Sequence, residues 1–579
     1  LLANDPSLEK SSNRNPSVCS SVAIRSPTSV EFRKLKQIEK GRLKKVPTNT
    51  SHSREQRASS MDRPMLRNVL VSQLTPGKTR HDDHPAFGVS GLLLSDGWIL
   101  SHGSLLSPNF SEARPHDIRD FLLAVQKEFE RDVVAVPQAV TESMRFRMQC
   151  KERDGGGESI RSARRIVEKD CSLRVVWRCP LLRRTLNDLL FSWSFEKIAK
   201  FDKSVLSIFL LLRVDGSSKS WEDDTTEGRR VLKYVFEFYR KHFGPPASLE
   251  LTRGASVEID SAPFGNAVFL DSLSRGIVSN TLGEEDCVIL TDANAVPGCE
   301  GAPVYLVDDK QALIGRICVS PHRSPGRRHR RICGLVIAPL SWCRGEWVDY
   351  TFAANLQACL RKILMRAPDK DYIAGALTSP GASHLLMPDL LDKSVIVVKC
   401  GSGWGTGVVV DVPTGTVLTC SHVAPGSRIK VMLGDKQDWA RLVYKTRDGQ
   451  PFDVAVLRLE GKHENLRALP LASEMPERGA SVLTAGYPFF SSSPASYSRG
   501  VVSRLTPCMI QTTCCVQSGA SGGPVICCTS GRMLGLIVSN AVSTASEHAA
   551  TALYPRFNMA VPATVIRKPI LEYVETGGQ

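Results

Sequence analysis

The stretch Gly519-Ala520-Ser521-Gly522-Gly523-Pro524 is the most informative segment in this chain of 579 residues. A nucleophilic serine needs a tight turn whose backbone N–H groups point at one spot, and the glycines permit such a turn. In that geometry the N–H groups of Gly519 and Ser521 would form an oxyanion hole, while the Ser521 hydroxyl attacks a carbonyl carbon. A lone turn of this composition is more often an ordinary loop, so its meaning depends on the residues that accompany it.

A histidine precedes this turn, followed by an aspartate, and their order is informative. His422 follows a β-like segment that contains Gly405 and Gly407. Asp453 stands just before an alternating apolar stretch, where its carboxylate can accept from an imidazole and hold the productive tautomer. The order His, Asp, Ser, with spacings of 31 and 68 residues, resembles that of trypsin-like serine proteases. We therefore predict His422, Asp453 and Ser521 as a catalytic triad, with Gly519 and Ser521 as the oxyanion hole.

The two halves of the chain repeat one pattern. Three matches occur in the same order: SRGIVS at 274–279 with SRGVVS at 498–503, PGCEGAPV at 297–304 with SGASGGPV at 518–525, and GLVI at 334–337 with GLIV at 535–538. Short apolar runs separated by Gly, Pro, Asp and Ser are typical of strands joined by turns, and helical periodicity is confined mainly to about 180–243. We therefore predict a mainly β protein with two tandem trypsin-like double β-barrels and helical insertions.

The first copy lacks the chemistry of the second. Its nucleophile position holds Glu300, and a carboxylate cannot serve as an acyl-transfer serine. The segment Ile99–His102 resembles the histidine segment, while Ser207 and Asp202 lie near the region expected for the acid. We expect a degenerate protease domain that acts as a partner or regulatory domain, with His102 vestigial rather than catalytic.

Charge and composition suggest the domain boundaries. Residues 1–80 carry 16 Lys/Arg against 6 Asp/Glu, whereas residues 388–579 carry 18 against 14, so most of the formal charge of +15 lies at the front. We predict a disordered basic tail over 1–84, the degenerate domain over 85–366, a linker over 367–389 and the catalytic domain over 390–579. The chain begins with Leu1, and we expect either a missing start or initiation at Met61.

Several partners and cofactors are disfavoured. The basic cluster at 327–331 has no interleaved aromatic residues for stacking on bases, so we expect no nucleic acid. The longest apolar run, 205–212, is too short to span a bilayer, so we expect no membrane partner. The 17 cysteines lack paired C-x-x-C spacing, which predicts reduced thiols, no metal and no cofactor.

Residues near the nucleophile bear on specificity. Digestive relatives of trypsin place Asp before the nucleophile to bind a new N-terminal amine, whereas this chain has Ala520, so the site should form without such activation. This feature resembles the intracellular HtrA/Deg branch. Cys515, six residues before Ser521, is expected to line the primary pocket and to favour a small or apolar P1 residue. We expect the strand edge at Ser539-Asn540-Ala541 to pair with an extended substrate.

The whole chain resembles the leader-peptide-processing proteases of peroxisomes, which are related to the Deg-type processing proteases of plant peroxisomes. The resemblance rests on motifs spread over about 85–575, among them APFG at 262–265, APLSW at 338–342 and QTTC at 511–514. It implies a peroxisomal-matrix endopeptidase that removes leader peptides from imported matrix proteins and processes itself. Such proteases end in a Ser-Lys-Leu type signal, whereas this chain ends Gly577-Gly578-Gln579, so we infer the location from the resemblance alone.

Two other functions stay open at this point. One is an HtrA-like quality-control protease, although the 58 residues after Ser521 leave no room for a PDZ-like domain. The other is a non-catalytic two-barrel scaffold, which the complete triad argues against. A homo-oligomer is compatible with the sequence.

Overall fold

The computed structural model describes residues 66–75, 84–94, 97–110, 121, 134–153, 164–189, 203–216, 224–244, 251–307, 330–343, 346–365, 386–447, 452–461, 463–489, 494–543 and 552–576. All of them belong to one compact unit that spans Pro64–Gln579. The predicted tail up to residue 65 and most of the predicted linker lie outside the described residues.

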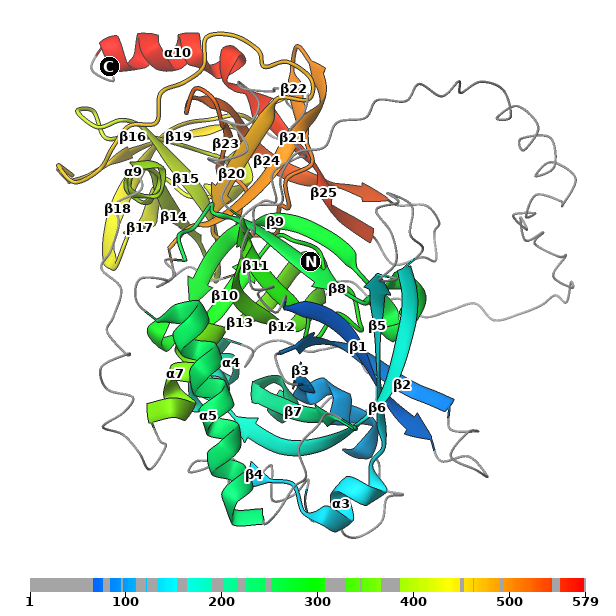
Figure 1. Ribbon diagram of the computed structural model, residues 1–579. Helices are drawn as coiled ribbons and strands as arrows, with labels where there is room; N and C mark the ends of the chain where they lie inside the picture. Colours follow the sequence, from blue (N-terminus) through cyan, green and yellow to red (C-terminus); the bar gives the residue numbers. More distant parts are fainter. Residues whose placement is uncertain are drawn as a thin grey trace, which may run out of the picture. The chain divides into compact units, whose positions relative to one another are not determined.

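The first barrel is built from the N-terminal strands (Figure 1). Its strands are β1 (Arg67–Thr75), β2 (His84–Leu93), β3 (Trp98–His102), β4 (Val134–Ala135), β5 (Phe146–Arg153), β6 (Arg164–Arg178) and β7 (Ile208–Val214). The sheet order is β4-β6-β5-β1-β2-β3-β7, and an additional β6–β7 pairing closes six of the strands into a ring.

Strand β1 corrects the predicted boundary of the N-terminal tail. It lies within the range 1–84 that we expected to be disordered, yet it pairs with both β2 and β5. Val69 and Val71 are fully buried and Leu70 is 1% exposed. The apolar run is only a few residues long and is flanked by polar, basic sequence, which is why composition hid it. Burial of three such side chains contributes roughly 1.5–3 kcal/mol each, which explains why the strand belongs to the folded body.

Three further sheets are closed barrels of six strands each. The second barrel of the first half contains β8 (Ser256–Ser261), β9 (Ser272–Leu282), β10 (Val288–Thr291), β11 (Pro303–Val307), β12 (Arg330–Cys343) and β13 (Glu346–Asn355). The second half begins with β14 (Val395–Cys400), β15 (Gly403–Asp411), β16 (Thr416–Thr419), β17 (Arg428–Leu433), β18 (Lys436–Lys445) and β19 (Ala455–Leu459). Its last barrel contains β20 (Ser481–Gly486), β21 (Ser496–Thr506), β22 (Met509–Thr512), β23 (Pro524–Cys527), β24 (Met533–Ser543) and β25 (Ala552–Pro562).

The repeated SRG motif has a steric cause. Gly276 lies in β9 and Gly500 at the matching place in β21. A Cβ on Gly276 would lie 2.3 Å from the backbone nitrogen of Ala293, and a Cβ on Gly500 would lie 2.5 Å from that of Cys514. Both barrels therefore need glycine where a neighbouring chain crosses the strand closely.

Helices fill the spaces around the barrels. They are α3 (Gln138–Ser143), α4 (Pro180–Leu189), α5 (Asp224–Phe243), α7 (Leu356–Met365), α9 (Leu386–Ser394) and α10 (Ala563–Glu575). Helices α4, α5 and α7 lie beside the first half, and α10 follows the last strand (Figure 1). The prediction of a mainly β chain with two double barrels and helical insertions is confirmed.

Two further observations concern the predicted partners. Within the described part of the chain, no helix combines the length and apolar character needed to cross a bilayer. Of the basic cluster at 327–331, only Arg330 and Arg331 are described, and they begin β12. Arg330 Nε lies 3.0 Å from Glu258 Oε2, and its guanidinium stacks over the Tyr305 ring, so an intramolecular contact occupies this cation.

Candidate active site

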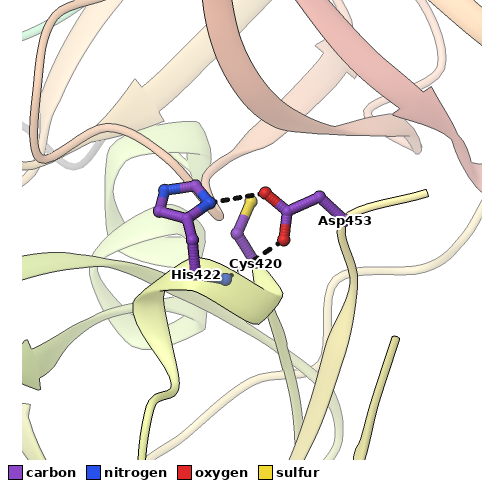
Figure 2. Close-up of side chains that lie close together, drawn as sticks. All are labelled: Cys420, His422 and Asp453. Carbon is purple, nitrogen blue, oxygen red and sulfur yellow. Dashed lines mark hydrogen bonds and ion pairs between the residues drawn. The ribbon is translucent and has the colours of Figure 1, made fainter. Parts of the chain in front are cut away.

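The histidine and aspartate of the predicted triad are brought together in the first barrel of the second half. His422 sits in a short 3-10 turn, Ser421–Val423, that follows β16, and Asp453 lies two residues before β19, the strand that pairs with β16. His422 Nδ1 lies 2.5 Å from Asp453 Oδ2, and the backbone N–H of His422 donates to Asp453 Oδ1 at 3.2 Å. Figure 2 shows one ring nitrogen directed at the carboxylate and the other on the far side of the ring. This arrangement holds the imidazole in one orientation.

The electrostatics favour an ionised Asp453. Burial opposes its charge, but the hydrogen bonds from the imidazole and from the backbone of His422 and Ser421 outweigh that cost and lower the pKa of Asp453. An ionised carboxylate accepts the Nδ1 proton of the imidazole, which leaves Nε2 as the proton acceptor.

The Ser521 turn is held by glycines and by contacts to the neighbouring barrel. Gly519 has a φ of 96° and Gly522 a φ of 86°, a region that disfavours side chains. A Cβ on Gly522 would lie 2.0 Å from the Thr406 carbonyl oxygen. Thr406 fixes the turn further, because its hydroxyl donates to the Gly519 carbonyl at 2.7 Å and its N–H donates to the Ser521 carbonyl at 2.8 Å. Ser521 Oγ donates to the carbonyl of Val538 at 3.0 Å.

Cys420 completes the cluster that Figure 2 draws. Its sulfur, the imidazole and the Asp453 carboxylate lie close enough together to suit a metal ion. The thiol is fully buried, however, and donates to the Ile537 carbonyl at 3.1 Å, while burial raises the pKa of Cys420 well above its usual value. A protonated thiol is a poor metal ligand, so the chemistry of the donors favours a proton-transfer site. Sequence reasoning missed both Cys420, two residues before His422, and Thr406, between Gly405 and Gly407.

The predicted substrate-binding residues lie around this turn. Ser539, Asn540 and Ala541 belong to β24 and pair with β25 on one side. On its other side, β24 pairs with β23 only through residues 533–536. Within the described residues, no strand therefore pairs with that edge of β24 at 538–541. Asn540 is turned inward, where its Nδ2 donates to the Val516 carbonyl. Their role in binding substrate stays a prediction.

Cys515 lies where the two halves of the chain meet. It is 2% exposed, its Sγ donates to the Asp349 carbonyl at 3.5 Å, and its own carbonyl accepts from Tyr350 Oη at 3.2 Å. The predicted floor of the primary pocket is therefore backed by residues of the first half. Its contribution to specificity stays a prediction.

The first half keeps the shape of the nucleophile turn but fills it with a carboxylate. Gly298 has a φ of 92° and Gly301 a φ of 81°, close to the values at Gly519 and Gly522. Glu300 occupies the position of Ser521, and its Oε2 accepts the N–H of Gly298 at 2.7 Å. The side chain thus folds back onto the donor that corresponds to the Gly519 N–H. Sequence reasoning identified Glu300 as a lost nucleophile but not as the occupant of this position.

The strand register corrects the interpretation of His102. Ser101 Oγ donates to the Ser90 carbonyl as Thr419 Oγ1 donates to the Thr406 carbonyl, so Ser101 corresponds to Thr419 and their strand partners Leu210 and Ala455 correspond to each other. His102 then corresponds to Cys420, and Ser104 is the residue that corresponds to His422. His102 is 1% exposed, and burial lowers its pKa to about 4, an effect that its hydrogen bond to the Leu206 carbonyl only partly opposes.

The same register locates the missing acid of the first half. The position two residues before Leu210, which corresponds to Asp453, is Ile208. Ser207 precedes this position, Asp202 lies outside the described residues, and Ile208 is fully buried. All three triad positions of the first half have therefore lost their chemistry.

Glu300 should make the stability of the first half depend on pH. Burial of the carboxylate raises its pKa from 4.5 to about 7, and the N–H groups of Glu300 and Gly298 offset only part of that effect. A raised acid pKa means that the stabilising contribution is complete below about pH 4.5 and is lost as the pH rises through about 7. Glu300→Gln mimics the protonated acid, so relative to the parent it should gain about 1–3 kcal/mol between pH 5 and pH 8. Thermal unfolding of both proteins at the two pH values measures this difference, and parallel pH profiles would contradict it.

Comparison with known proteins agrees with this geometry. Residues 405–536 match the family model of the trypsin-like peptidase domain. The second half of the chain therefore carries a trypsin-like peptidase domain, as the order and spacing of His422, Asp453 and Ser521 predicted.

Two relatives share a printed name. The chain is 32% identical over 347 residues to the peroxisomal leader peptide-processing protease of Homo sapiens, a match that covers 56% of this chain and 56% of that protein. It is 32% identical over 354 residues to the protein of the same name from Mus musculus, covering 56% and 57% respectively. The matched part thus spans little more than half the length of these relatives.

Among solved structures, the chain is similar to an inactive mutant of Rv3671c from M. tuberculosis, at 22% identity and a TM-score of 0.26, over 34% of this chain and 96% of that one. It is also similar to the serine endoprotease from Yersinia pestis, at 22% identity and a TM-score of 0.27, over 34% of this chain and 69% of that one.

Proposed function

We propose that the second half is a serine endopeptidase that uses His422, Asp453 and Ser521. The observation that carries this proposal is the imidazole of His422, which lies 2.5 Å from Asp453 in the same peptidase domain as the glycine-bounded turn of Ser521. A side-chain pair of this kind supplies a general base, and the turn supplies a nucleophile beside backbone N–H donors.

The reaction follows from these groups. Ser521 Oγ attacks the scissile carbonyl carbon while His422 Nε2 takes its proton, and Asp453 stabilises the imidazolium that forms. The N–H groups of Gly519 and Ser521 stabilise the negative oxygen of the tetrahedral intermediate. His422 then gives the proton to the leaving amine as the C–N bond breaks, which leaves an acyl-enzyme. Water hydrolyses this ester by the same sequence of proton transfers.

We further propose that the protein is a processing protease of the peroxisomal matrix. Support comes from the motifs in both halves that resemble those of leader-peptide-processing proteases, and from the names of the human and mouse relatives. Its substrates would be imported matrix proteins that carry leader peptides, and it would also cut itself.

Cleavage should leave new N-termini after small or apolar residues. The expected pocket residue Cys515 offers no carboxylate that could bind a basic P1 side chain. Purified protein is incubated with leader-bearing peroxisomal enzymes, and the new N-termini are identified by mass spectrometry, with Ser521→Ala as the control. Cuts mainly after Lys or Arg would contradict the pocket assignment.

The same experiment distinguishes the proposed processing protease from a quality-control protease. A processing enzyme should make one or a few cuts near the N-terminus of a folded substrate. If folded leader-bearing proteins stayed intact while an unfolded protein such as reduced casein was degraded to many peptides, the HtrA-like reading would replace the one proposed here.

A further inference from the structure

The contact between the two halves joins corresponding barrels. The β8–β13 barrel of the first half packs against the β20–β25 barrel of the second, with β9 beside β21 and β13 beside β25. The β20–β25 barrel supplies the Ser521 turn, which begins directly after the segment 514–518. Groups of the first half therefore lie within reach of the segment that leads into the active site.

Asp292 is the centre of this contact. It follows β10, is 1% exposed, and uses both carboxylate oxygens. Its Oδ1 accepts the N–H of Ile277 in its own barrel at 2.7 Å. Its Oδ2 accepts two bonds from the other half, from Ser498 Oγ at 2.8 Å and from the N–H of Arg499 at 2.8 Å.

Ser498 links Asp292 to the segment 514–518, which leads into the Ser521 turn. Its hydroxyl oxygen accepts the N–H of Cys515 at 2.7 Å while its proton is given to Asp292. The carbonyl of the same residue, Cys515, accepts from Tyr350 Oη of the first half. Both sides of Cys515 are thus held by chains of contacts that begin in the first half, four residues before Gly519.

The corresponding position in the second half shows that Asp292 Oδ2 has a role separate from that of Oδ1. Thr513 corresponds to Asp292, and its Oγ1 accepts the N–H of Val501 at 3.0 Å, just as Asp292 Oδ1 accepts that of Ile277. A threonine is therefore sufficient for the local bond within a barrel. The second oxygen that aspartate adds is the one that accepts from Ser498 and Arg499.

We propose that Asp292 of the catalytically silent first half is a positioning residue for the active site of the second half. Through Ser498 it holds the backbone at Cys515, and thereby the turn whose N–H groups at Gly519 and Ser521 receive the oxyanion. The inference rests on the proposed peptidase function, and it assigns the first half a positioning role in catalysis.

The variant Asp292→Thr tests this assignment, because it copies the residue of the other barrel. It keeps an oxygen for the Ile277 N–H and removes the oxygen that reaches Ser498. A misplaced oxyanion donor acts on the transition state more than on ground-state binding. We expect kcat to fall tenfold to hundredfold with KM changed less than threefold, and the rate of Ser521 labelling by a fluorophosphonate probe to fall in parallel.

Asp392→Asn is the matched control. Asp392 accepts from Arg253 across the same two halves, and both side chains contact Tyr497 rather than Ser498 or Cys515. Its kcat should stay within threefold of the parent. A loss equal to that of Asp292→Thr would show that only the association of the halves matters, and the relay would be rejected.

Ser498→Ala gives a second route to the same answer if Asp292→Thr unfolds. It should reproduce the loss of kcat, and hydrogen exchange of a peptide covering 511–521 should become faster, whereas Ser498→Thr should restore most of the rate. Unchanged kcat and exchange in Ser498→Ala would overturn the proposal. A parent protein that neither cleaves nor reacts with the probe would instead refute the peptidase function.

Discussion

Replacing Ser521 with alanine is expected to lower kcat/KM by about 10⁵- to 10⁶-fold, because the attacking oxygen is removed while the oxyanion donors remain. The turn itself should persist, since Gly519 and Gly522 set its backbone conformation. Steady-state cleavage of a leader-bearing substrate and labelling by a fluorophosphonate probe both measure the effect.

Ser530→Ala provides the matched control for this prediction. Ser530 is an exposed serine in the turn between β23 and β24, a few residues beyond the nucleophile. Its replacement should leave kcat/KM within threefold of the parent. Undiminished cleavage by Ser521→Ala would eliminate the acyl-enzyme mechanism, whereas equal losses in both variants would indicate misfolding of the barrel.

Replacing Asp453 with asparagine should lower kcat about 10⁴-fold without disturbing the fold. The amide has nearly the shape of the carboxylate, but it can donate to Nδ1 of His422 and so stabilise the tautomer whose Nε2 carries the proton. That tautomer cannot accept the proton of Ser521. Turnover of a peptide substrate gives kcat, and the melting temperature shows whether the domain is intact.

The same barrel offers a second aspartate–histidine pair as the control for this change. His463 Nε2 lies 3.0 Å from Asp438 Oδ2, and Asp438 belongs to β18. Asp438→Asn removes a comparable charge and should change kcat less than threefold. A small effect of Asp453→Asn, similar to that of Asp438→Asn, would remove Asp453 from the mechanism.

The candidate site was predictable because its signals are local. Ser521 lies in a glycine turn, His422 follows a strand, and Asp453 precedes one, and each pattern can be recognised within about ten residues. The repeat between the halves was also visible locally. A close backbone contact in each of these two barrels leaves room only for glycine at Gly276 and at Gly500.

The features that sequence reasoning missed depend on register or on distant contacts. His102 looked like the vestige of a base because it ends a strand-like segment, but the pairing of Ser101 with Leu210 shifts it by two residues from that position. Glu300 was read as a loss, yet only the folded turn shows its carboxylate accepting from Gly298. The bond from Ser498 to Asp292 joins residues 206 positions apart, which no local pattern reports.

The packing of β9 against β21 has a consequence for how the enzyme responds to dilution. Residues 366–385 connect the two barrel pairs covalently, so their association is a unimolecular step. Covalent connection generally gives two bodies an effective concentration for each other on the order of millimolar. Activity per molecule should therefore not depend on protein concentration, whereas separating the two halves into two chains would turn the contact into a bimolecular equilibrium.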